Sequence, residues 1–213
     1  LVFNLSMINN NSIDVCAAKY FKPIIDNKVA VPIIIHKGVL GQEKLYNYIQ
    51  NVVDLYEGKK GTYELRMKAF LLLFFSELYD NFIKEMNILA NKLGMTSTNF
   101  KNPHGLDNET ENISTAHDLA LLMRYATTNK TFMEITKLKK YMLTSNIEAH
   151  IWYNKNELLR SYKFLTGGKI GYTEKAGYMF VSSATKAGEN LIVVTMKEKD
   201  RFNTHKKLYE EYF

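Results

Sequence analysis

The fold is decided by one stretch, Gly167-Gly168-Lys169-Ile170-Gly171-Tyr172-Thr173, and by the two apolar runs that follow it. The runs are Tyr178-Met-Phe-Val-Ser-Ser-Ala and Asn190-Leu-Ile-Val-Val-Thr-Met, and both are predicted to be β-strands. The short turn Lys186-Ala187-Gly188-Glu189 joins them as a hairpin. Residues 201–213 are predicted to close the chain as an amphipathic helix.

The segment before this sheet is dominated by predicted helices. Residues 62–93 form a long helical stretch whose apolar side chains recur every three or four positions, with a slip near Ser76. That apolar set is Leu65, Ala69, Leu72, Leu73, Phe82, Ile83, Met86, Leu89 and Leu93. Gly94 ends the helix as its C′ residue, and Thr115 with Asp118 forms a capping signature that opens a helix over 116–127.

Three further elements are expected. Residues 1–5 and 29–36 are predicted to be strands, and residues 16–25 a helix that Pro23 disturbs. Residues 102–107 have the composition of an ordered loop.

The order of elements predicts an α+β fold, an antiparallel sheet flanked by helices. We expect a single domain over 1–213, with a mostly helical lobe at about 20–165 between the N-terminal strand and the C-terminal hairpin and helix.

The composition excludes several classes of protein. The chain has 213 residues, 46% of them hydrophobic and 23% charged, which is ordinary for a globular protein. The net charge of +6 comes mostly from dispersed lysines without a nucleic-acid-binding motif, so we expect no nucleic-acid partner. The longest apolar run is far shorter than the ~20 residues that span a bilayer. We expect no metal and no cofactor, because the histidines lack ligand spacing and no glycine-rich phosphate loop is present.

Four segments carry residues that suit chemistry. Cys16 and Lys19 share one face if they lie on a helix, where a lysine can take the proton of a nucleophile; the alternative is that this single cysteine is a small buried apolar residue. Ser76 is either a reactive hydroxyl or an ordinary helix-surface or helix-break serine. Lys169 beside Gly171 on an edge strand lets a substrate backbone approach closely, or is a surface lysine at a strand entry. His104 is either a base or a structural hydrogen-bonding residue.

Taken together, these segments resemble a known family. The stretch from Leu93 through Asn102-Pro103-His104-Gly105-Leu106-Asp107, and then Ser114-Thr115-Ala116-His117-Asp118, closely resembles the D-alanyl-D-alanine carboxypeptidases among the low-molecular-mass penicillin-binding proteins, peptidase family S11. Residues 168–178 resemble the K-T-G strand of that family and its continuation. The resemblance implies a β-lactamase/transpeptidase-like fold, and it is strongest after Met86.

The resemblance also implies roles for individual residues. The nucleophile of the family's S-x-x-K element falls on Cys16 and its lysine on Lys19, while the serine of the S-x-N element falls on Ser76. The K-T-G element falls on Lys169, Ile170 and Gly171, which would bind substrate. The implied reaction is hydrolysis of the bond between the last two D-alanines of a peptidoglycan stem peptide through a covalent acyl-enzyme, and β-lactams would be trapped as slow acyl-enzymes.

All three elements depart from the family pattern. Cysteine stands at 16, Leu78 replaces the asparagine of S-x-N, and Ile170 replaces the hydroxyl residue of K-T-G. We therefore expect an acyl hydrolase whose activity these changes reduce; the alternative is a degenerate, non-catalytic member that binds peptidoglycan or a protein partner. A thiol-dependent acyl enzyme with a changed substrate is a third interpretation.

The expected location is the bacterial cell envelope, outside the cytoplasm, either secreted or attached to a membrane surface through a segment outside this chain. The chain starts at Leu1 without a methionine, so we expect a processed or truncated start whose signal is not in this sequence. The expected partners are a peptidoglycan pentapeptide or a β-lactam.

Overall fold

The computed structural model describes residues 41–107, 110–144 and 149–213. The predicted strands at 1–5 and 29–36 and the predicted helix at 16–25 lie outside these residues. The chain divides into two compact units. The described parts of the first are residues 41–86 and 102–105, and those of the second are residues 87–101, 106–107, 110–144 and 149–213. The single-domain organisation stays a prediction.

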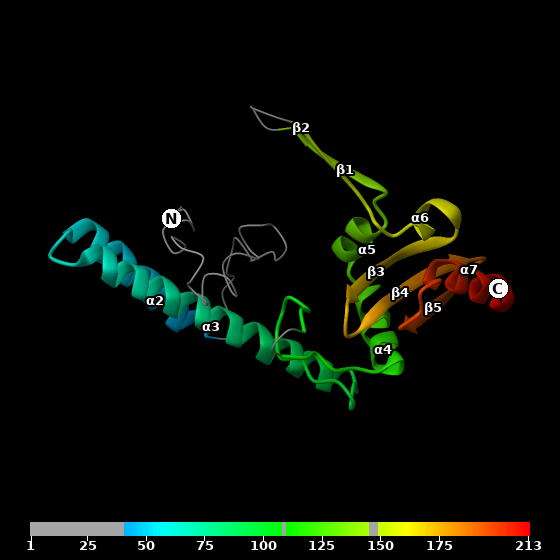
Figure 1. Cartoon of the computed structure of the whole chain (residues 1–213), viewed down its shortest axis with the longest axis horizontal. Coiled ribbons are helices and arrows are strands. Elements are labelled where there is room, and N and C mark those ends of the chain that lie inside the picture. Colours follow the sequence, from blue (N-terminus) through cyan, green and yellow to red (C-terminus); the bar gives the residue numbers. More distant parts are fainter. Residues whose placement is uncertain (1–40, 108–109, 145–148) are drawn as a thin grey trace. The chain divides into compact units, whose positions relative to one another are not determined.

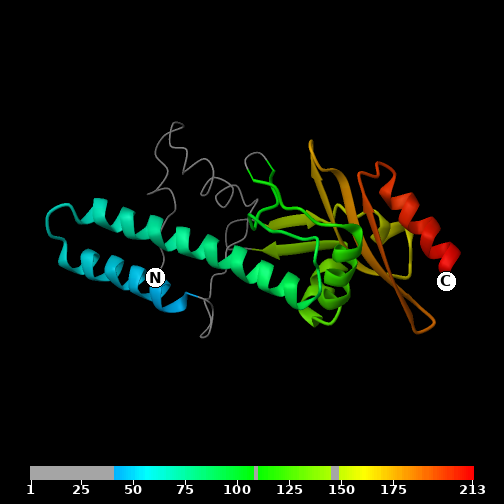
Figure 2. The ribbon, with the colours of Figure 1, turned by 90° about the horizontal axis from the view of Figure 1, so that it is seen from below.

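The first unit is built on two helices, α2 (Gln42–Gly58) and α3 (Tyr63–Lys92), which run side by side in opposite directions (Figure 2). Its core joins Leu45 and Val52 of α2 to one stripe of α3, which consists of Met67, Leu71, Phe74, Phe75, Leu78 and Tyr79. These positions recur at the spacing of one helix face. The predicted apolar set was therefore partly wrong, since Leu65 is 68% and Leu73 47% exposed.

The predicted long helix is confirmed: α3 is continuous from Tyr63 to Lys92, and the slip in the apolar spacing near Ser76 does not interrupt it. The helix ends as expected at Gly94, which has a φ of 77°. The amide of Met95 donates to the carbonyl oxygen of Ala90 at 2.9 Å, and the amide of Gly94 donates to that of Asn91 at 3.1 Å. These two bonds form a Schellman motif, and the buried Met95 side chain completes it.

The second unit holds a three-stranded antiparallel sheet in the order β3-β4-β5 (Figure 1), formed by β3 (Leu165–Thr173), β4 (Gly177–Lys186) and β5 (Glu189–Met196). The predicted hairpin is confirmed. Ala187 and Gly188 both have positive φ, 51° and 87°, as a two-residue turn between twisted strands requires. Strand β3 lies at the edge of the sheet formed by the described strands, so one side of its backbone has no strand partner among the described residues.

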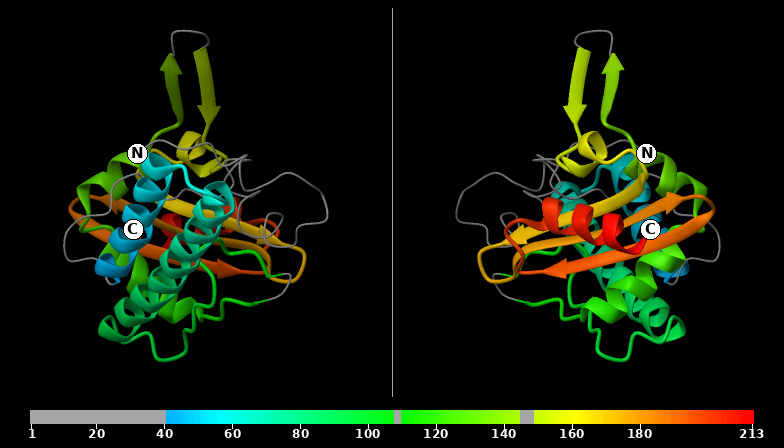
Figure 3. Two further views of the ribbon diagram at one scale, coloured as in Figure 1. Left: turned by 90° about the vertical axis from the view of Figure 1, so that its left-hand side faces the viewer. Right: turned by 90° about the vertical axis from the view of Figure 1, so that its right-hand side faces the viewer.

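Helix α7 (Arg201–Tyr212) packs across one face of the sheet (Figure 3), where Phe180, Ala184 and Tyr209 are buried with Leu158 and Tyr162. Helix α4 (Ala116–Ala126) contacts β4 and β5, and Figures 1 and 2 show it on the other side of the sheet. The predicted cap of α4 is confirmed, because the amide of Asp118 donates to Thr115 Oγ1 at 3.1 Å. This arrangement confirms the α+β class.

Several elements were not predicted. They are α2, α5 (Lys130–Thr136), the hairpin of β1 (Lys140–Thr144) with β2 (Ala149–Tyr153), and α6 (Leu158–Ser161). In the part of the chain that the structure describes, no helix is both long enough and apolar enough to cross a membrane.

Candidate functional site

Strand β3 presents Lys169 and Gly171 at the open edge of the sheet. Lys169 pairs with Val181 and Gly171 with Met179 in the register with β4. The Lys169 side chain is exposed, and its Nζ donates to the carbonyl oxygen of Ile170 at 2.7 Å. The edge therefore offers an ammonium group beside unpaired backbone, an arrangement that suits an extended peptide ending in a carboxylate.

The two glycines next to Lys169 differ in the space around them. A Cβ atom on Gly168 would lie 2.7 Å from the carbonyl oxygen of Val181 and 3.0 Å from Ser182 Cβ, so only glycine fits there. A Cβ atom on Gly171 would meet only Met179 Cβ, at an ordinary 3.8 Å. Gly168 is thus required by packing, whereas packing does not require Gly171.

Ile170 points to the other face of β3. It is half-buried and packs against the cluster that contains Phe180 and Tyr209. Successive residues of a strand alternate between faces, so Ile170 is separated from the face that carries Lys169 and Gly171. Its side chain contributes to the core of the second unit.

A hydrogen bond links the end of β3 to the predicted loop. Thr173 Oγ1 donates to Asp107 Oδ2 at 2.5 Å and also accepts from the amide of Ala176 at 3.0 Å. Lys175 forms an ion pair with Glu111 nearby. Asp107 and Thr173 therefore fix the strand two residues beyond Gly171. Sequence reasoning placed both residues in family-like segments but did not pair them.

The loop over 102–107 has no regular secondary structure, as predicted. Asn102 is buried and its Oδ1 accepts from the amide of Gly105 at 2.7 Å, and Gly105 has a φ of 77°. His104 is half-buried in the same turn. The turn is thus held by its own side chain.

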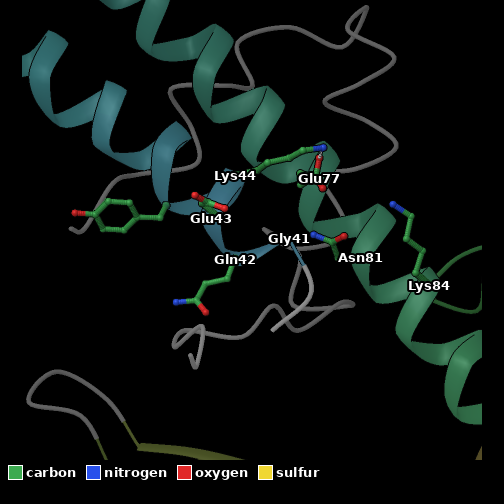
Figure 4. A pocket seen from close by; sticks show the side chains of 8 residues that line it. Gly41, Gln42, Glu43, Lys44, Glu77, Asn81 and Lys84 are labelled. Carbon is green, nitrogen blue, oxygen red and sulfur yellow. Dashed lines mark ion pairs between the residues drawn. The ribbon is translucent and has the colours of Figure 1, made fainter. Parts of the chain in front are cut away.

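In the first unit, Ser76 lies exposed on the surface of α3, and Leu78 is 3% exposed in the core. A pocket lies beside the same helix (Figure 4), lined by Gly41, Gln42, Glu43, Lys44, Tyr46, Glu77, Asn81 and Lys84. Lys44 Nζ and Glu77 Oε2 are 3.5 Å apart across it. Asn81 is buried, and its Nδ2 has no hydrogen-bond partner among the described groups.

The predicted site residues fall into three places. Cys16 and Lys19 lie outside the described residues, Ser76 belongs to the first unit, and Lys169, Ile170 and Gly171 lie together on β3 in the second. Within residues 41–107, 110–144 and 149–213, no group of three or more histidine, cysteine, aspartate or glutamate side chains is arranged to hold a metal ion.

A buried polar cluster lies beneath the sheet and is separate from the edge of β3. Ser182 Oγ is 2.7 Å from His205 Nδ1 and 2.8 Å from Tyr209 Oη, and Thr195 Oγ1 is 3.0 Å from His205 Nε2. Ser182, His205 and Tyr209 are each 0% exposed. Burial lowers the pKa of His205 to about 3. Because these groups are buried, a substrate has no access to them. Ser182 and Thr195 belong to the sheet and His205 and Tyr209 to α7, so the cluster joins α7 to the sheet.

The comparisons with known proteins agree with this architecture. A family model described as D-alanyl-D-alanine carboxypeptidase matches residues 74–200. A D-alanyl-D-alanine carboxypeptidase of Mycobacterium tuberculosis is 38% identical over 115 residues, covering 54% of this chain and 40% of that protein. One from Escherichia coli is 39% identical over 133 residues, covering 61% of this chain and 32% of that protein.

Solved structures give the same result. A crystal structure of a D-alanyl-D-alanine carboxypeptidase from Mycobacterium tuberculosis aligns with a TM-score of 0.59 at 32% identity, covering 68% of this chain and 58% of that one. The DD-transpeptidase of Streptomyces aligns with a TM-score of 0.55 at 28% identity, covering 71% of this chain and 56% of that one. The fold is therefore that of the DD-peptidases.

The chain belongs to the D-alanyl-D-alanine carboxypeptidase family, peptidase family S11. The matched segments span only 40% and 32% of the two curated relatives. Cys16 and Lys19 precede the matched segment, whereas Ser76 and residues 169–171 lie within it.

Proposed function

We propose that this protein is a D-alanyl-D-alanine carboxypeptidase-type acyl hydrolase that acts on the stem peptides of peptidoglycan. The observation that carries the proposal is the edge strand β3, which lies in the segment matched by the family model and presents Lys169 and Gly171. Because peptidoglycan lies outside the cytoplasmic membrane, the proposed location is the bacterial cell envelope. β-Lactams are the proposed inhibitors.

In the proposed reaction, the Cys16 thiol transfers its proton to Lys19 and attacks the carbonyl carbon between the last two D-alanines. The carbon–nitrogen bond breaks, a thioester forms, and D-alanine leaves after its nitrogen takes the proton back from Lys19. Water then attacks the thioester, which releases the shortened peptide and restores the thiol. Backbone N–H groups at Cys16 and just after Gly171 stabilise the oxyanion.

The edge of β3 aligns the substrate in this scheme. The extended peptide pairs with the free backbone of β3, and the Lys169 ammonium attracts its terminal carboxylate. The small surface of Gly171 permits close approach. Ser76 assists proton transfer, and the link from Asp107 to Thr173 holds β3 in place.

The altered motifs predict a slow enzyme. Ile170 supplies no hydroxyl for the carboxylate, and its side chain packs toward the core. Losing a charge-assisted hydrogen bond of roughly 1.5–3 kcal/mol slows the reaction about 10- to 100-fold. Leu78 likewise supplies no amide to the substrate, because it is buried in the core of the first unit.

The test is intact-mass measurement after incubation of the full chain with a penicillin, together with assay of D-alanine release from a pentapeptide mimic. We expect a covalent adduct that the Cys16→Ala variant lacks. We also expect slower release in Lys169→Gln, with Lys60→Gln as the control because Lys60 is exposed in the connection between α2 and α3. No adduct and no released D-alanine would overturn the proposal, and retained muropeptide binding would then indicate the non-catalytic relative.

A further inference from the structure

The hairpin of β1 and β2 exposes a large apolar surface. Among the strands that the structure describes, these two pair only with each other, and every residue in them is exposed. Six large side chains, Tyr141, Met142, Leu143, Ile151, Trp152 and Tyr153, are between 49% and 65% exposed. Scattered apolar side chains are normal on protein surfaces, but a contiguous group of this size marks an interaction site.

The apolar side chains occupy both faces of the hairpin. Tyr141 pairs with Trp152 and Met142 with Ile151, and successive pairs point to opposite faces. On one face the rings of Tyr141, Trp152 and His150 are stacked, with centroids 6.2 Å and 5.5 Å apart along the row. A flat partner covers only one face of such a ribbon, whereas a fluid medium covers both.

The base of the hairpin is held firmly. Asn154 Nδ2 donates to the carbonyl oxygens of Leu138 at 3.0 Å and Thr136 at 3.4 Å, and the Asn154 amide donates to that of Lys139 at 3.0 Å. Arg160 Nη2 in turn donates to the Asn154 carbonyl oxygen at 3.0 Å. The hairpin therefore extends from a fixed base (Figure 1).

The same base carries a basic pocket. Five cationic side chains line it, from Lys139, Arg160, Lys163, Lys186 and Lys206, and Glu210 is the carboxylate among its lining residues. Glu210 Oε1 lies 3.8 Å from Lys206 Nζ, which leaves four positive charges in excess. Residues 137–156 contain four lysines and one carboxylate, that of Glu148. The apolar hairpin and the cationic pocket are adjacent, because Lys139 precedes β1 and Arg160 contacts Asn154.

We propose that this hairpin inserts into the interface of an anionic phospholipid membrane, with lipid phosphates at the basic pocket. Tyrosine and tryptophan favour the membrane–water interface because each has an apolar ring and a polar tip. Each lysine or arginine near an anionic surface adds about fivefold to binding. The cationic side chains match the negative charge of lipid headgroups. The hairpin is apolar on both faces, and acyl chains can cover both faces at once. A polynucleotide would stack on one face only, so it fits this surface less well.

The test uses Trp152, which is the single tryptophan of the chain. The full chain is mixed with vesicles of phosphatidylcholine alone or with phosphatidylglycerol added, and binding is followed by sedimentation and by tryptophan emission. We expect binding to the anionic vesicles, a shift of emission to shorter wavelength, and quenching by lipids that carry a quencher at shallow depth.

Two pairs of substitutions separate the apolar and cationic contributions. Met142→Thr with Ile151→Thr removes apolar side chains from one paired site and keeps residues that suit strands. Lys139→Gln with Lys163→Gln removes two charges from the pocket, and we expect about 25-fold weaker binding, fivefold for each charge. The control pair, Lys60→Gln with Lys92→Gln, changes the net charge equally at exposed positions elsewhere.

Several outcomes would overturn the proposal. They are failure to bind vesicles, binding without a change in Trp152 emission, and equal loss of affinity in the control pair. Full competition by soluble inorganic phosphate would show simple anion binding instead. A concentration-dependent emission shift without vesicles would show that a second copy of the chain covers the hairpin. Circular dichroism confirms that each variant is folded.

Discussion

Acid should destabilise the C-terminal unit through His205. This side chain is fully buried between the sheet and α7, with its ring stacked 4.1 Å from that of Phe180. Its two nitrogens contact the hydroxyl groups of Ser182 and Thr195, which act as donor or acceptor as the neutral ring requires. Burial lowers the pKa of His205 to about 3. The folded protein therefore holds this histidine neutral.

The direction and size of the effect follow from proton linkage. An unfolded chain protonates histidine near pH 6.5, so between about pH 3 and 6.5 the unfolded state binds the additional proton. Stability is then constant above pH 7 and falls as the pH drops below 6.5. With pKa values of 6.5 unfolded and about 3 folded, the loss between pH 8 and pH 5 is about 2 kcal/mol.

The assay is urea unfolding followed by circular dichroism at pH 8 and pH 5. We compare the parent chain with His205→Gln, whose amide retains hydrogen bonding but does not titrate. The variant starts less stable at pH 8, and its additional loss at pH 5 should be smaller by about 2 kcal/mol. His150→Gln is the control, because it removes a histidine whose side chain is exposed. An equal loss at pH 5 in His205→Gln would refute the reasoning.

Four further substitutions test the site, its supports and the base of the β1–β2 hairpin. Gly168→Ala should lower the free energy of unfolding by about 1–3 kcal/mol through overlap with the Val181 carbonyl. Gly171→Ala should leave stability unchanged in urea titration while slowing D-alanine release, and unchanged release would mean that no substrate approaches Gly171. Asp107→Ala should loosen the end of β3 and slow acylation by penicillin in stopped-flow measurements, while the melting temperature falls only slightly. Asn154→Ala should speed amide hydrogen exchange in β1 and β2 without affecting β4 and β5, and uniform exchange rates would contradict the role of Asn154 at the hairpin base.

Local signals predicted the parts of the fold that depend on neighbouring residues. Gly94 ends α3, and Thr115 caps α4 with its own side chain. The turn at Ala187 and Gly188 closes the β4–β5 hairpin. Each of these features is fixed within a few residues, so the sequence pattern contains the whole interaction.

Features that depend on distant partners were not predictable in the same way. Helix α3 carries more than one apolar stripe, and α2 selects the stripe that contains Leu71 and Leu78 and leaves Leu73 exposed. The β1–β2 hairpin is apolar on both faces, so it lacks the alternation that identifies a half-buried strand. The bond from Thr173 to Asp107 joins two segments far apart in the chain.

Leu78 and Ile170, the positions that we propose depart from the family motifs, contribute to the two cores. Leu78 is buried with Leu71 and Phe75 in the first unit, and Ile170 packs toward Phe180 in the second. Restoring an asparagine at 78 would bury an amide at a cost of about 2–5 kcal/mol, whereas a threonine at the half-buried position 170 should cost less.

A combined Cys16→Ser and Ile170→Thr variant is therefore the sharper test of lost chemistry, because it changes the proposed nucleophile and the carboxylate contact without unfolding the first unit. If this variant releases D-alanine faster than the parent chain, the substitutions at 16 and 170 reduced an inherited activity. If it stays folded and gains nothing, the roles proposed for positions 16 and 170 are wrong, and the apolar side chains at 78 and 170 are explained by packing alone.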